Sequence, residues 1–389
     1  MNKTVINGLS LFANVGIAEA YFKDIGVHIA IANELIERRA QFYQEVYPDA
    51  EVICGDITSD ELRTEIVNKA IEKKVNFIIA TPPCQGMSVA GNRDSNDPRN
   101  QLIFYAIDVI KRVNPDFVML ENVPRQLSTK IRVGNELVCI PDYIRAELGD
   151  CYTFNKDTLA KAKDFSVPQL RERNIFLLVK KTYGFTWEFP PKQPEVSLQE
   201  AIGHLPPLDP LLREGLALTI EKFPDFEKKK ASGIAVSPWH HPPTHPWRQV
   251  EWMMHTPTGK SAIYNSPNYI PRNKNGSEIK AHHNHYRRMT WEKPSRTITM
   301  YNNFISTLAS VHPGRPYKSK SGEILYSDPR VLSVYELLIV MSIPLSWPIP
   351  SWCDDSFLRA VIGEGIPSKM ARDILNQLLF LLKNHSNKG

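Results

Sequence analysis

The chain has 389 residues with 42% hydrophobic and 23% charged residues, ordinary values for a globular protein, which exclude wholesale disorder. Its apolar runs fall short of the roughly 20 residues that a membrane helix needs, and the start, MNKTVINGLS, lacks the apolar region of a secretory signal. The five cysteines are odd in number and form no C-x-x-C pair, which argues against a disulfide framework or a cysteine-built zinc site and fits a reducing cytoplasm.

Residues 1–181 alternate short apolar runs with helical patterns, which predicts a mostly parallel sheet flanked by helices. The predicted strands are Val5–Phe12, Val27–Asn33, Glu51–Cys54, Asn76–Thr81, Asp116–Leu120, Tyr152–Lys156 and Asn174–Lys180. The predicted helices between them are Leu35–Tyr47, Asp60–Lys73 and Gln101–Arg112. Runs such as NFIIA and DFVML are apolar throughout, as expected for strands that are buried on both faces.

The chain changes character after about Tyr183. Of its 30 prolines, 21 fall between Pro190 and Pro350, too many for central strands or long helices. Helical patterns resume at Val334–Met341 and Lys369–Leu382. Residues 189–353 carry 19 Lys and Arg against 13 Asp and Glu, in a chain whose total net charge is +5. We therefore expect two differently built parts, of which the second meets a polyanionic partner.

Cys84 follows the apolar run NFIIA and two prolines, so we expect it at the carboxyl end of the sheet, where open α/β folds bind their ligands. A free thiol has a pKa near ~8.5, so a nucleophilic role needs help from the surroundings, and the alternative is a buried, inert cysteine. The polar segment after it, SVAGNRDSNDPRN, resembles a mobile lid more than a core wall, which favours a reactive role.

Two further groups are expected at the same edge. Glu121 directly follows an apolar strand, and partial desolvation there raises a carboxyl pKa and suits it to proton donation. A helix-capping or salt-bridged glutamate is the alternative. In the segment QLRER, Arg171 and Arg173 are two apart and can share one face of an extended chain. They can hold a phosphate, a carboxylate or a cysteine-activating network, or form surface salt bridges.

The ends of the first three predicted strands indicate a nucleotide-type ligand. The turn LFANVG has one glycine where such fingerprints usually carry two or three. Glu34 closes the second strand, the usual place for an acid that binds ribose hydroxyls, and Asp56 follows the third. The turn and the two acids jointly predict an adenosine-containing ligand.

Together these residues resemble the cytosine-5 DNA methyltransferase family, in order and over almost the whole chain. The matching motifs are P-C-Q at Pro83–Gln85, D-P-R-x-x-L at Asp97–Leu102, E-N-V at Glu121–Val123, Q-x-R-x-R at Gln169–Arg173, P-x-x-T-I at Pro294–Ile298, R-x-L-S-x-x-E at Arg330–Glu336 and, in place of the closing G-N-A-V-P, Gly363–Pro367.

The resemblance implies a mechanism. The Cys84 thiolate would attack C6 of a cytosine while Glu121 holds the N3 edge and favours its protonation. C5 would then take the methyl group of S-adenosylmethionine, and loss of the C5 proton would expel Cys84. Arg171 would stabilise the base on its O2 side, and Arg173 would support the cysteine and backbone. Since C6 is inaccessible within a duplex, the cytosine has to be flipped out.

The resemblance also implies a cofactor site without a metal. Its residues would be Phe12, Gly16, Glu34, Asp56, Ile57, Pro83 and Leu102. Three positions depart from the family pattern: Asn14 replaces a glycine of F-x-G-x-G, Ser10 stands where an acid is common, and Glu364 replaces the asparagine of the closing motif. Asparagine adopts positive φ more readily than other non-glycine residues, so the turn can survive.

DNA contacts are implied for Gln85, Ser88, Arg93 and Arg99, with residues 88–100 as the lid that closes on DNA. Residues 189–353 would include the target-recognition region, whose basic charge and polar loops suit phosphate contact and base-edge reading. Its tryptophans are expected mostly in the core of that domain. Its histidines have no local cysteine partners, so we expect hydrogen-bonding roles for them and no zinc site.

The expected fold is therefore α/β: a Rossmann-like, class I S-adenosylmethionine-dependent methyltransferase sheet plus a smaller, irregular, mainly β and loop domain. Residues 1–188, completed by a C-terminal helix at 354–389, would bind cofactor and perform the chemistry, and residues 189–353 would form the recognition domain and hinge. We expect a monomer acting on a specific sequence of double-stranded DNA in the bacterial cytoplasm, associated with the nucleoid and not with a membrane. A restriction endonuclease would be its genetic partner.

Two alternatives stay open. One is a tRNA cytosine-5 methyltransferase on the same fold, although the recognition segment is longer than a compact tRNA enzyme would need. The other is a catalytically silent DNA-binding module, which would not require Cys84, Glu121, Arg171 and Arg173 all to be intact.

Overall fold

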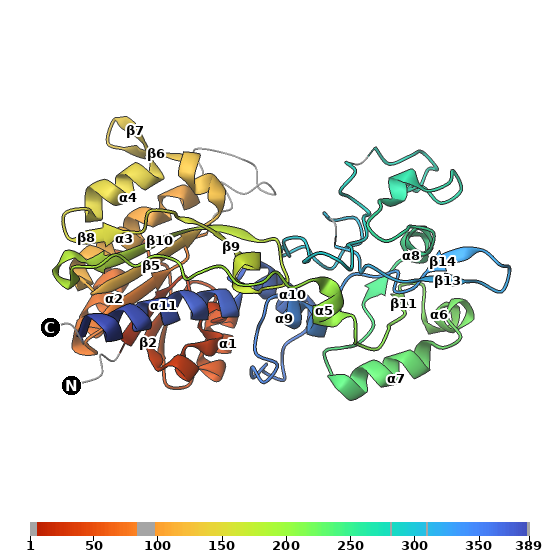
Figure 1. Cartoon of the computed structure of the whole chain (residues 1–389), viewed down its shortest axis with the longest axis horizontal. Coiled ribbons are helices and arrows are strands. Elements are labelled where there is room, and N and C mark those ends of the chain that lie inside the picture. Colours follow the sequence, from red (N-terminus) through yellow and green to blue (C-terminus); the bar gives the residue numbers. More distant parts are fainter. Residues whose placement is uncertain (1–5, 84–97, 281, 309, 387–389) are drawn as a thin grey trace.

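The computed structural model describes residues 6–83, 98–280, 282–308 and 310–386. Its sheet lobe is built on an eight-stranded sheet of order β3-β2-β1-β4-β5-β10-β8, with β9 paired to β10 (Figure 1). The strands are β1 (Ile6–Leu11), β2 (Val27–Glu34), β3 (Glu51–Cys54), β4 (Phe77–Ala80), β5 (Phe117–Asn122), β8 (Tyr152–Phe154), β9 (Leu159–Lys161) and β10 (Glu172–Lys180). β1 to β5 run parallel and β10 runs antiparallel to β5, so β1 to β5 all end at one edge.

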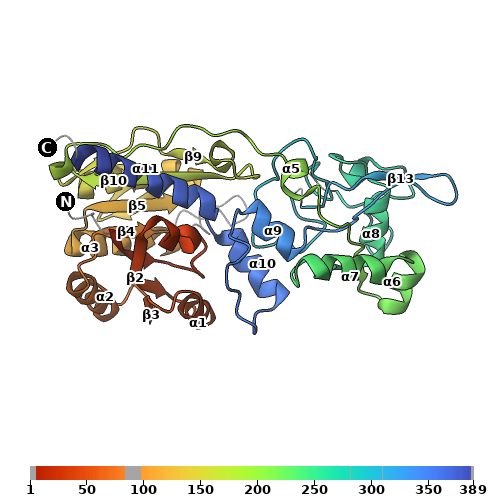
Figure 2. The same cartoon turned by 60° about the horizontal axis from the view of Figure 1, so that its bottom comes forward.

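Helices cover both faces of this sheet (Figure 2). They are α1 (Glu37–Val46), α2 (Asp60–Glu72), α3 (Leu102–Val113), α4 (Ile140–Leu148) and α11 (Ser368–Ser386). Phe77 and Phe117 belong to the apolar cluster that includes α11, whereas Ile78 and Val118 belong to the cluster of α2 and α3. Burial on both faces explains why these strands are apolar at every position. The predicted strands and helices of this lobe are confirmed within a few residues of their ends.

Some elements were not predicted. The hairpin of β6 (Lys130–Val133) and β7 (Glu136–Cys139) and the helix α4 follow β5. The C-terminal segment expected as one helix is two, α10 (Asp355–Glu364) and α11, separated at Gly365-Ile366-Pro367. Proline has no backbone N–H to continue α10 and is tolerated at the start of α11.

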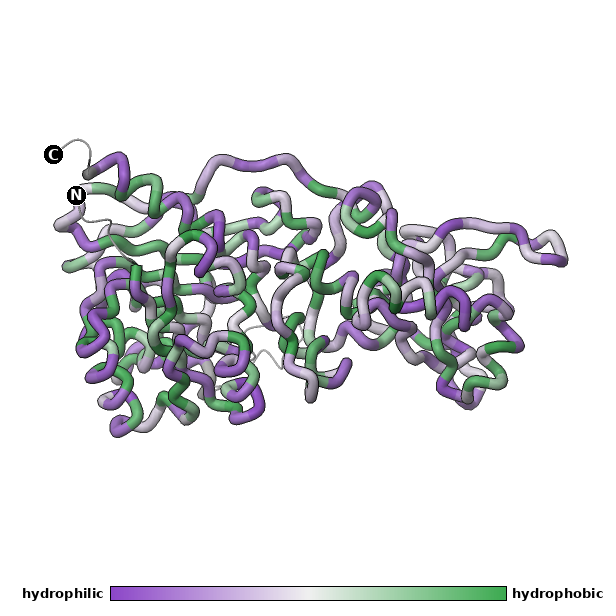
Figure 3. The backbone as a smooth tube through the Cα atoms, turned by 90° about the horizontal axis from the view of Figure 1, so that it is seen from below, coloured by the Kyte–Doolittle hydropathy of each residue, from purple (hydrophilic) through white to green (hydrophobic). Residues whose placement is uncertain are grey.

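The second lobe has its own apolar core, which contains Leu212, Phe226, Trp252, Ile305 and Val331. Its elements are α6 (Leu216–Lys222), α7 (Phe226–Val236), α8 (Trp247–Met254), η7 (Ala262–Tyr264) and the strand pairs β11 (Leu211–Leu212) with β12 (Thr244–His245) and β13 (Pro316–Lys318) with β14 (Ile324–Tyr326). The lobe is as irregular as expected but more helical. The β13–β14 hairpin extends from its far end as a mostly hydrophilic arm (Figures 1 and 3).

A third cluster joins the two lobes. α5 (Leu198–Ile202) and α9 (Val334–Val340) pack through Ile202 and Leu337 into a group that also contains Ile17 and Phe42 of the sheet lobe and Ile362 of α10. The junction is therefore a packed interface and not a loose linker. None of the helices in the described ranges has both the length and the apolar character that crossing a membrane requires.

Candidate active site

A buried ion pair lies at the carboxyl edge of the sheet. Glu121, the penultimate residue of β5, is 8% exposed, and its Oε1 lies 2.7 Å from Nε of Arg173. The antiparallel register places Ile175 of β10 opposite Glu121. Arg173 precedes Ile175 by two residues, so its side chain is on the same face of the sheet and next to Glu121. The strand pairing therefore fixes a carboxylate and a guanidinium side by side.

The surroundings act on the proton affinity of this carboxyl in opposite directions. Burial raises the pKa of Glu121, while the charges of Arg173 and then Arg171 lower it. The net pKa lies above the ordinary value. Such a carboxyl can bind a proton more readily than a solvated glutamate and pass it to a bound base.

Arg171 is 1% exposed and binds backbone carbonyls of distant segments. Its Nη1 donates to the carbonyl of Ile298 at 2.8 Å, and its Nη2 donates to the carbonyls of Gly363 and Glu364 at 3.1 Å each. The two arginines of the Q-x-R-x-R motif thus have different contacts. Arg173 pairs directly with the acid, and Arg171 fastens the second half of the chain to the sheet lobe.

The chain leaving β4 is held against β5. Asn122 donates from Nδ2 to the carbonyl of Pro82 at 3.1 Å, and its Oδ1 accepts the N–H of Val123 at 2.9 Å. Pro83, which follows, is exposed. The sequence identifies Asn122 only as part of the E-N-V motif and gives no signal for its contact with Pro82.

Several predicted residues fall outside what the structure describes. Cys84, Gln85, Ser88 and Arg93 lie in the stretch 84–97, outside the described residues. Arg99 falls within η3 (Pro98–Gln101), but its side chain is likewise outside the description. Their predicted roles remain predictions.

The turn after β1 is tight. Phe12, Asn14 and Gly16 all have left-handed backbone angles, with φ of 58°, 51° and 77°. Asn14, which replaces a family glycine, adopts the positive φ expected of it. Glu34 is 6% exposed, and its Oε2 accepts the N–H of Asn14 at 2.8 Å while its Oε1 accepts that of Ile36 at 3.0 Å. The acid therefore braces the turn from the end of β2.

Gly16 is required by close packing as well as by φ. A Cβ built there would lie 2.1 Å from Cε2 of Tyr47. The Tyr47 hydroxyl donates to the Gly16 carbonyl and accepts from Nε1 of Trp347 at 3.2 Å. A chain of polar contacts thus links the turn to the segment between α9 and α10.

The donor set around this turn fits an adenosine-type cofactor. Beyond Glu34, the apolar side chains of Leu35 and Ile36 are 62% and 45% exposed, which leaves apolar surface open beside the acid. Ile57 is buried at the neighbouring strand end, and Asp56 is exposed with Oδ1 accepting the N–H of Thr58 at 2.9 Å. An acid flanked by open apolar surface suits a ribose carrying a flat ring. Sequence reasoning missed Leu35, for which the signal was an apolar residue directly after the acid.

Phe12 and Leu102, the other two predicted cofactor residues, are half-buried against the cluster of α2 and α3. The three departures from the family pattern also have partners in the fold. Asn14 Nδ2 donates to the carbonyl of Val361 at 3.1 Å, and Glu364 pairs with Arg39 at 2.8 Å. Ser10 Oγ donates to the buried Glu19 at 2.6 Å.

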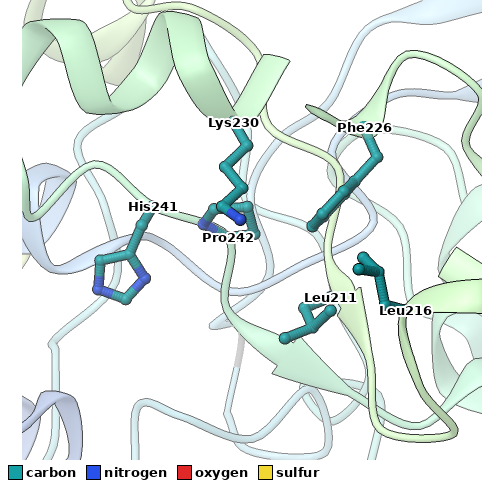
Figure 4. A pocket seen from close by; sticks show the side chains of 6 residues that line it. All are labelled: Leu211, Leu216, Phe226, Lys230, His241 and Pro242. Atoms are coloured by element: carbon teal, nitrogen blue, oxygen red, sulfur yellow. The ribbon is translucent and has the colours of Figure 1, made fainter. Parts of the chain in front are cut away.

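A pocket of about 400 Å³ lies in the second lobe, apart from these groups (Figure 4). Leu211, Leu216, Phe226 and Pro242 form apolar walls, and the side chains of Lys230 and His241 lie at its side. It contains no residue of the predicted sites. Among the described residues, no three His, Cys, Asp or Glu side chains are grouped so that they could hold a metal ion.

Comparison with known proteins gives a consistent picture. The profile of the family described as C-5 cytosine-specific DNA methylase matches residues 6–379. The chain is 41% identical over 381 residues to the Type II methyltransferase M1.HgaI of Avibacterium volantium, covering 97% of this chain and 99% of the relative. It is 32% identical to the Type II methyltransferase M.DdeI of Desulfomicrobium norvegicum over 213 residues, which is 52% of this chain and 49% of the relative.

Two solved structures share the fold. A DNA modification methyltransferase encoded within a prophage (E. coli) superimposes with a TM-score of 0.65 at 20% identity, covering 97% of this chain and 99% of that one. DNMT2 of Spodoptera frugiperda superimposes with a TM-score of 0.59 at 18% identity, covering 96% and 99%. Both share the expected sheet architecture.

Proposed function

The chain belongs to the C-5 cytosine-specific DNA methylase family, and from this premise we propose that it is the modification enzyme of a restriction–modification pair. Its activity is methylation of cytosine C5 in DNA. The observation that best supports a specific chemistry is the buried ion pair of Glu121 and Arg173 at the carboxyl edge of the sheet. We propose that this pair receives a cytosine flipped out of a specific duplex sequence.

In the proposed reaction, Cys84 Sγ forms a bond to C6 of the cytosine while the Glu121 carboxyl supplies a proton to N3. The electron pair displaced from the C5–C6 double bond makes C5 nucleophilic. S-adenosylmethionine supplies the methyl group when it is bound. Transfer of the C5 proton to water then restores the C5–C6 double bond and expels the Cys84 thiolate, and the N3 proton returns to the Glu121 carboxylate. The hold of Asn122 on Pro82 supports this arrangement, because it fixes the chain two residues before the nucleophile.

The geometry favours a revised division of labour between the arginines. We propose that Arg173, rather than Arg171, lies beside the base, since it already contacts Glu121. Arg171 would act as a positioning residue that joins Ile298 and Gly363 to the sheet lobe.

For the cofactor we propose the seven predicted residues and Leu35. Glu34 would accept the ribose hydroxyls, with Leu35 and Ile57 against the two sides of the adenine. Phe12, Gly16, Asp56, Pro83 and Leu102 would line the rest of the site. The braced turn and the exposed apolar side chain beside the acid support this assignment.

The remaining proposals concern DNA and the cell. Gln85, Ser88, Arg93 and Arg99 would contact DNA, and the second lobe, within residues 189–353, would read the target sequence. Residues 1–188, with α10 and α11, would perform the chemistry. We propose a monomer that acts in the bacterial cytoplasm on nucleoid DNA and is paired genetically with a restriction endonuclease.

The test is transfer of labelled methyl groups from S-adenosylmethionine to duplex DNA and to tRNA, with Cys84→Ala beside the wild type. Labelling of duplex DNA by the wild type alone is expected, and bisulfite sequencing of DNA from expressing cells would then reveal the target sequence. Labelling of tRNA only, or of neither, would contradict the proposal. Undiminished labelling by Cys84→Ala would contradict the covalent mechanism.

A further inference from the structure

Residues 297–305 form a turn of the second lobe that is clamped to the sheet lobe through Gln169 and Arg171. Ile298 donates its N–H to Oε1 of Gln169 at 3.2 Å, and its carbonyl accepts from Arg171 at 2.8 Å. Gly363 presses against the next residue, because a Cβ there would lie 2.3 Å from the Thr299 carbonyl. We call residues 297–305 the clamped turn.

The clamp continues through Asn302, which is 4% exposed. Its Nδ2 donates to the carbonyls of Thr299 at 2.7 Å and Arg359 at 2.8 Å, and its Oδ1 accepts from Nη1 of Arg359 at 3.2 Å. Ile305, fully buried in the core of the second lobe, closes the turn. The backbone of this turn is therefore fixed at both ends and in the middle.

Two large aromatic rings are left in solvent by this fixed backbone. Tyr301 is 51% exposed and Phe304 is 45% exposed. Exposed rings on a well-anchored turn are available to a ligand, and aromatic side chains are the groups on which nucleic-acid bases stack. Tyr301 is three residues from Ile298, so their Cα atoms are at most about 11 Å apart, and Ile298 is bonded to an arginine that influences Glu121.

A loop of residues 284–296, which we call the cationic loop, adjoins the clamped turn. His285 Nδ1 lies 2.7 Å from the carbonyl of Ser306, directly after the turn. In the same loop, Oδ1 of Asn284 accepts from Arg296 at 2.9 Å and from Arg287 at 3.2 Å. The positive groups so gathered suit the phosphates of a nucleic-acid backbone. Figure 1 shows the chain between α8 and β13 reaching toward β9 and α10, on the side of the second lobe that faces the sheet.

We propose that Tyr301 stacks on the bases next to the target cytosine and stabilises the duplex in its opened form, while the cationic loop holds the adjoining phosphates. Extruding a base leaves its neighbours unstacked, and an aromatic ring replaces the lost stacking whatever the neighbouring bases are. Because the backbone of the turn is already fixed, only the side-chain torsions of Tyr301 have to be restricted when its ring inserts. This inference rests on the proposed function, since it concerns the same cytosine-flipping reaction.

The experiment compares single-turnover methylation by wild type, Tyr301→Ala and Tyr301→Phe on two duplexes that carry the mapped target sequence. In one duplex the target cytosine is paired with guanine, and in the other it faces an abasic site and is already free to leave the stack. Tyr301→Ala should be slower on the paired duplex by on the order of tenfold to a hundredfold and within about threefold of wild type on the abasic one. Tyr301→Phe should retain the wild-type rate on both.

Fluorescence of 2-aminopurine at the target position gives a readout independent of catalysis, and Tyr301→Ala should lower the fluorescence gained on binding. Tyr317→Ala, on the β13–β14 arm and 43% exposed, is the matched control and should behave as wild type. Equal loss on both duplexes, or no loss with wild-type activity intact, would overturn this inference while leaving the methyltransferase assignment standing. Failure of wild type to methylate either duplex would instead contradict the proposed function.

Discussion

Among single residues, Glu121 depends most closely on its neighbours. Its burial favours the neutral carboxyl, and Arg173 at 2.7 Å favours the carboxylate. Protonating N3 of a cytosine requires the neutral form, whereas a strong acid would have lost its proton at neutral pH. Glu121 can thus keep its proton until the base is bound, and Arg173 stabilises the carboxylate that remains once the proton has been transferred.

Removing the cation should change the pH dependence of catalysis. In Arg173→Gln the pKa of Glu121 rises further, because burial then acts without the opposing charge. The decline of kcat/KM on the alkaline side that reports Glu121 should therefore move to higher pH, although the maximal rate falls. Arg173→Lys keeps the charge and should leave the decline near its wild-type position. A pH profile of unchanged shape in Arg173→Gln would show that Glu121 does not govern it.

Tyr47 supports the cofactor turn without being among the residues proposed to touch the cofactor. Tyr47→Phe removes the hydroxyl that donates to the Gly16 carbonyl and accepts from Trp347. Loss of about 0.5–1.5 kcal/mol per hydrogen bond predicts a roughly two- to tenfold weaker affinity for S-adenosylmethionine. Isothermal titration measures it without catalysis, and Tyr264→Phe, on a tyrosine that is 70% exposed, serves as control. Equal affinities in the wild type and Tyr47→Phe would exclude this role.

At the scale of elements, the sheet lobe was readable from the sequence and the second lobe was not. Parallel strands that are buried on both faces appear in the sequence as continuous apolar runs, so the positions of β1 to β5 are predicted to within a few residues. Helix α7 contains three consecutive lysines and a glycine and gives little periodic signal. The second lobe depends on contacts between residues that are distant in the sequence, and such contacts produce no local sequence pattern.

The site divides in the same way. The motifs identified Glu121, Arg171 and Arg173, but not which arginine pairs with the acid, because that depends on the register of β10 against β5. Leu35 and Tyr301 are ordinary apolar and aromatic residues in the sequence. The sequence signal for Leu35 is its place directly after the acid, and the exposure of both side chains is seen only in the folded chain.

A buried ionic cluster joins Glu336 of α9 to residues that precede this helix, and it should control acid stability. Arg330 pairs with Asp328 and Glu336 at 2.8 Å each, and Nε2 of His312 lies 3.7 Å from Glu336. Burial lowers the pKa of His312 from 6.5 to about 4. A histidine held neutral stabilises the fold above its ordinary pKa, and this contribution is lost as pH falls from about 6.5 toward 4.

His312→Gln should therefore flatten the pH dependence of the free energy of unfolding between about 6.5 and 4, because glutamine does not titrate. Urea denaturation at several pH values measures this. Some acid lability should remain below that range. Burial acts to raise the pKa of Glu336, but the charges of Arg330 and His312 outweigh it and lower this pKa from 4.5 to about 2. The stability that the ionised Glu336 contributes is therefore lost as pH falls from about 4.5 to 2. An unchanged slope between 6.5 and 4 would assign the lability to other groups.

On the scale of the whole molecule, charge and chemistry are separated. The acid, the arginines and the braced turn belong to the sheet lobe, whereas residues 189–353 carry 19 basic against 13 acidic side chains. The packed junction, through α5, α9 and Arg171, holds the basic lobe in a fixed relation to the acid. Under the proposed division of labour, a duplex bound by the second lobe would lie next to the lobe that carries the acid.

This separation predicts how salt should act. Affinity for duplex DNA should fall steeply with ionic strength, because each phosphate contact releases condensed counterions. Arg296→Ala, which removes an exposed cation of the loop beside the clamped turn, should reduce the slope of log affinity against log salt by about 1. Fluorescence anisotropy at several salt concentrations measures the slope. Lys23→Ala, in η2 (Lys23–Ile25) of the sheet lobe and with a side chain 92% exposed, removes the same charge and should leave it unchanged. Equal slopes for wild type and Arg296→Ala would mean that the DNA phosphates contact other parts of the second lobe. Affinity for S-adenosylmethionine should be the same in all three proteins.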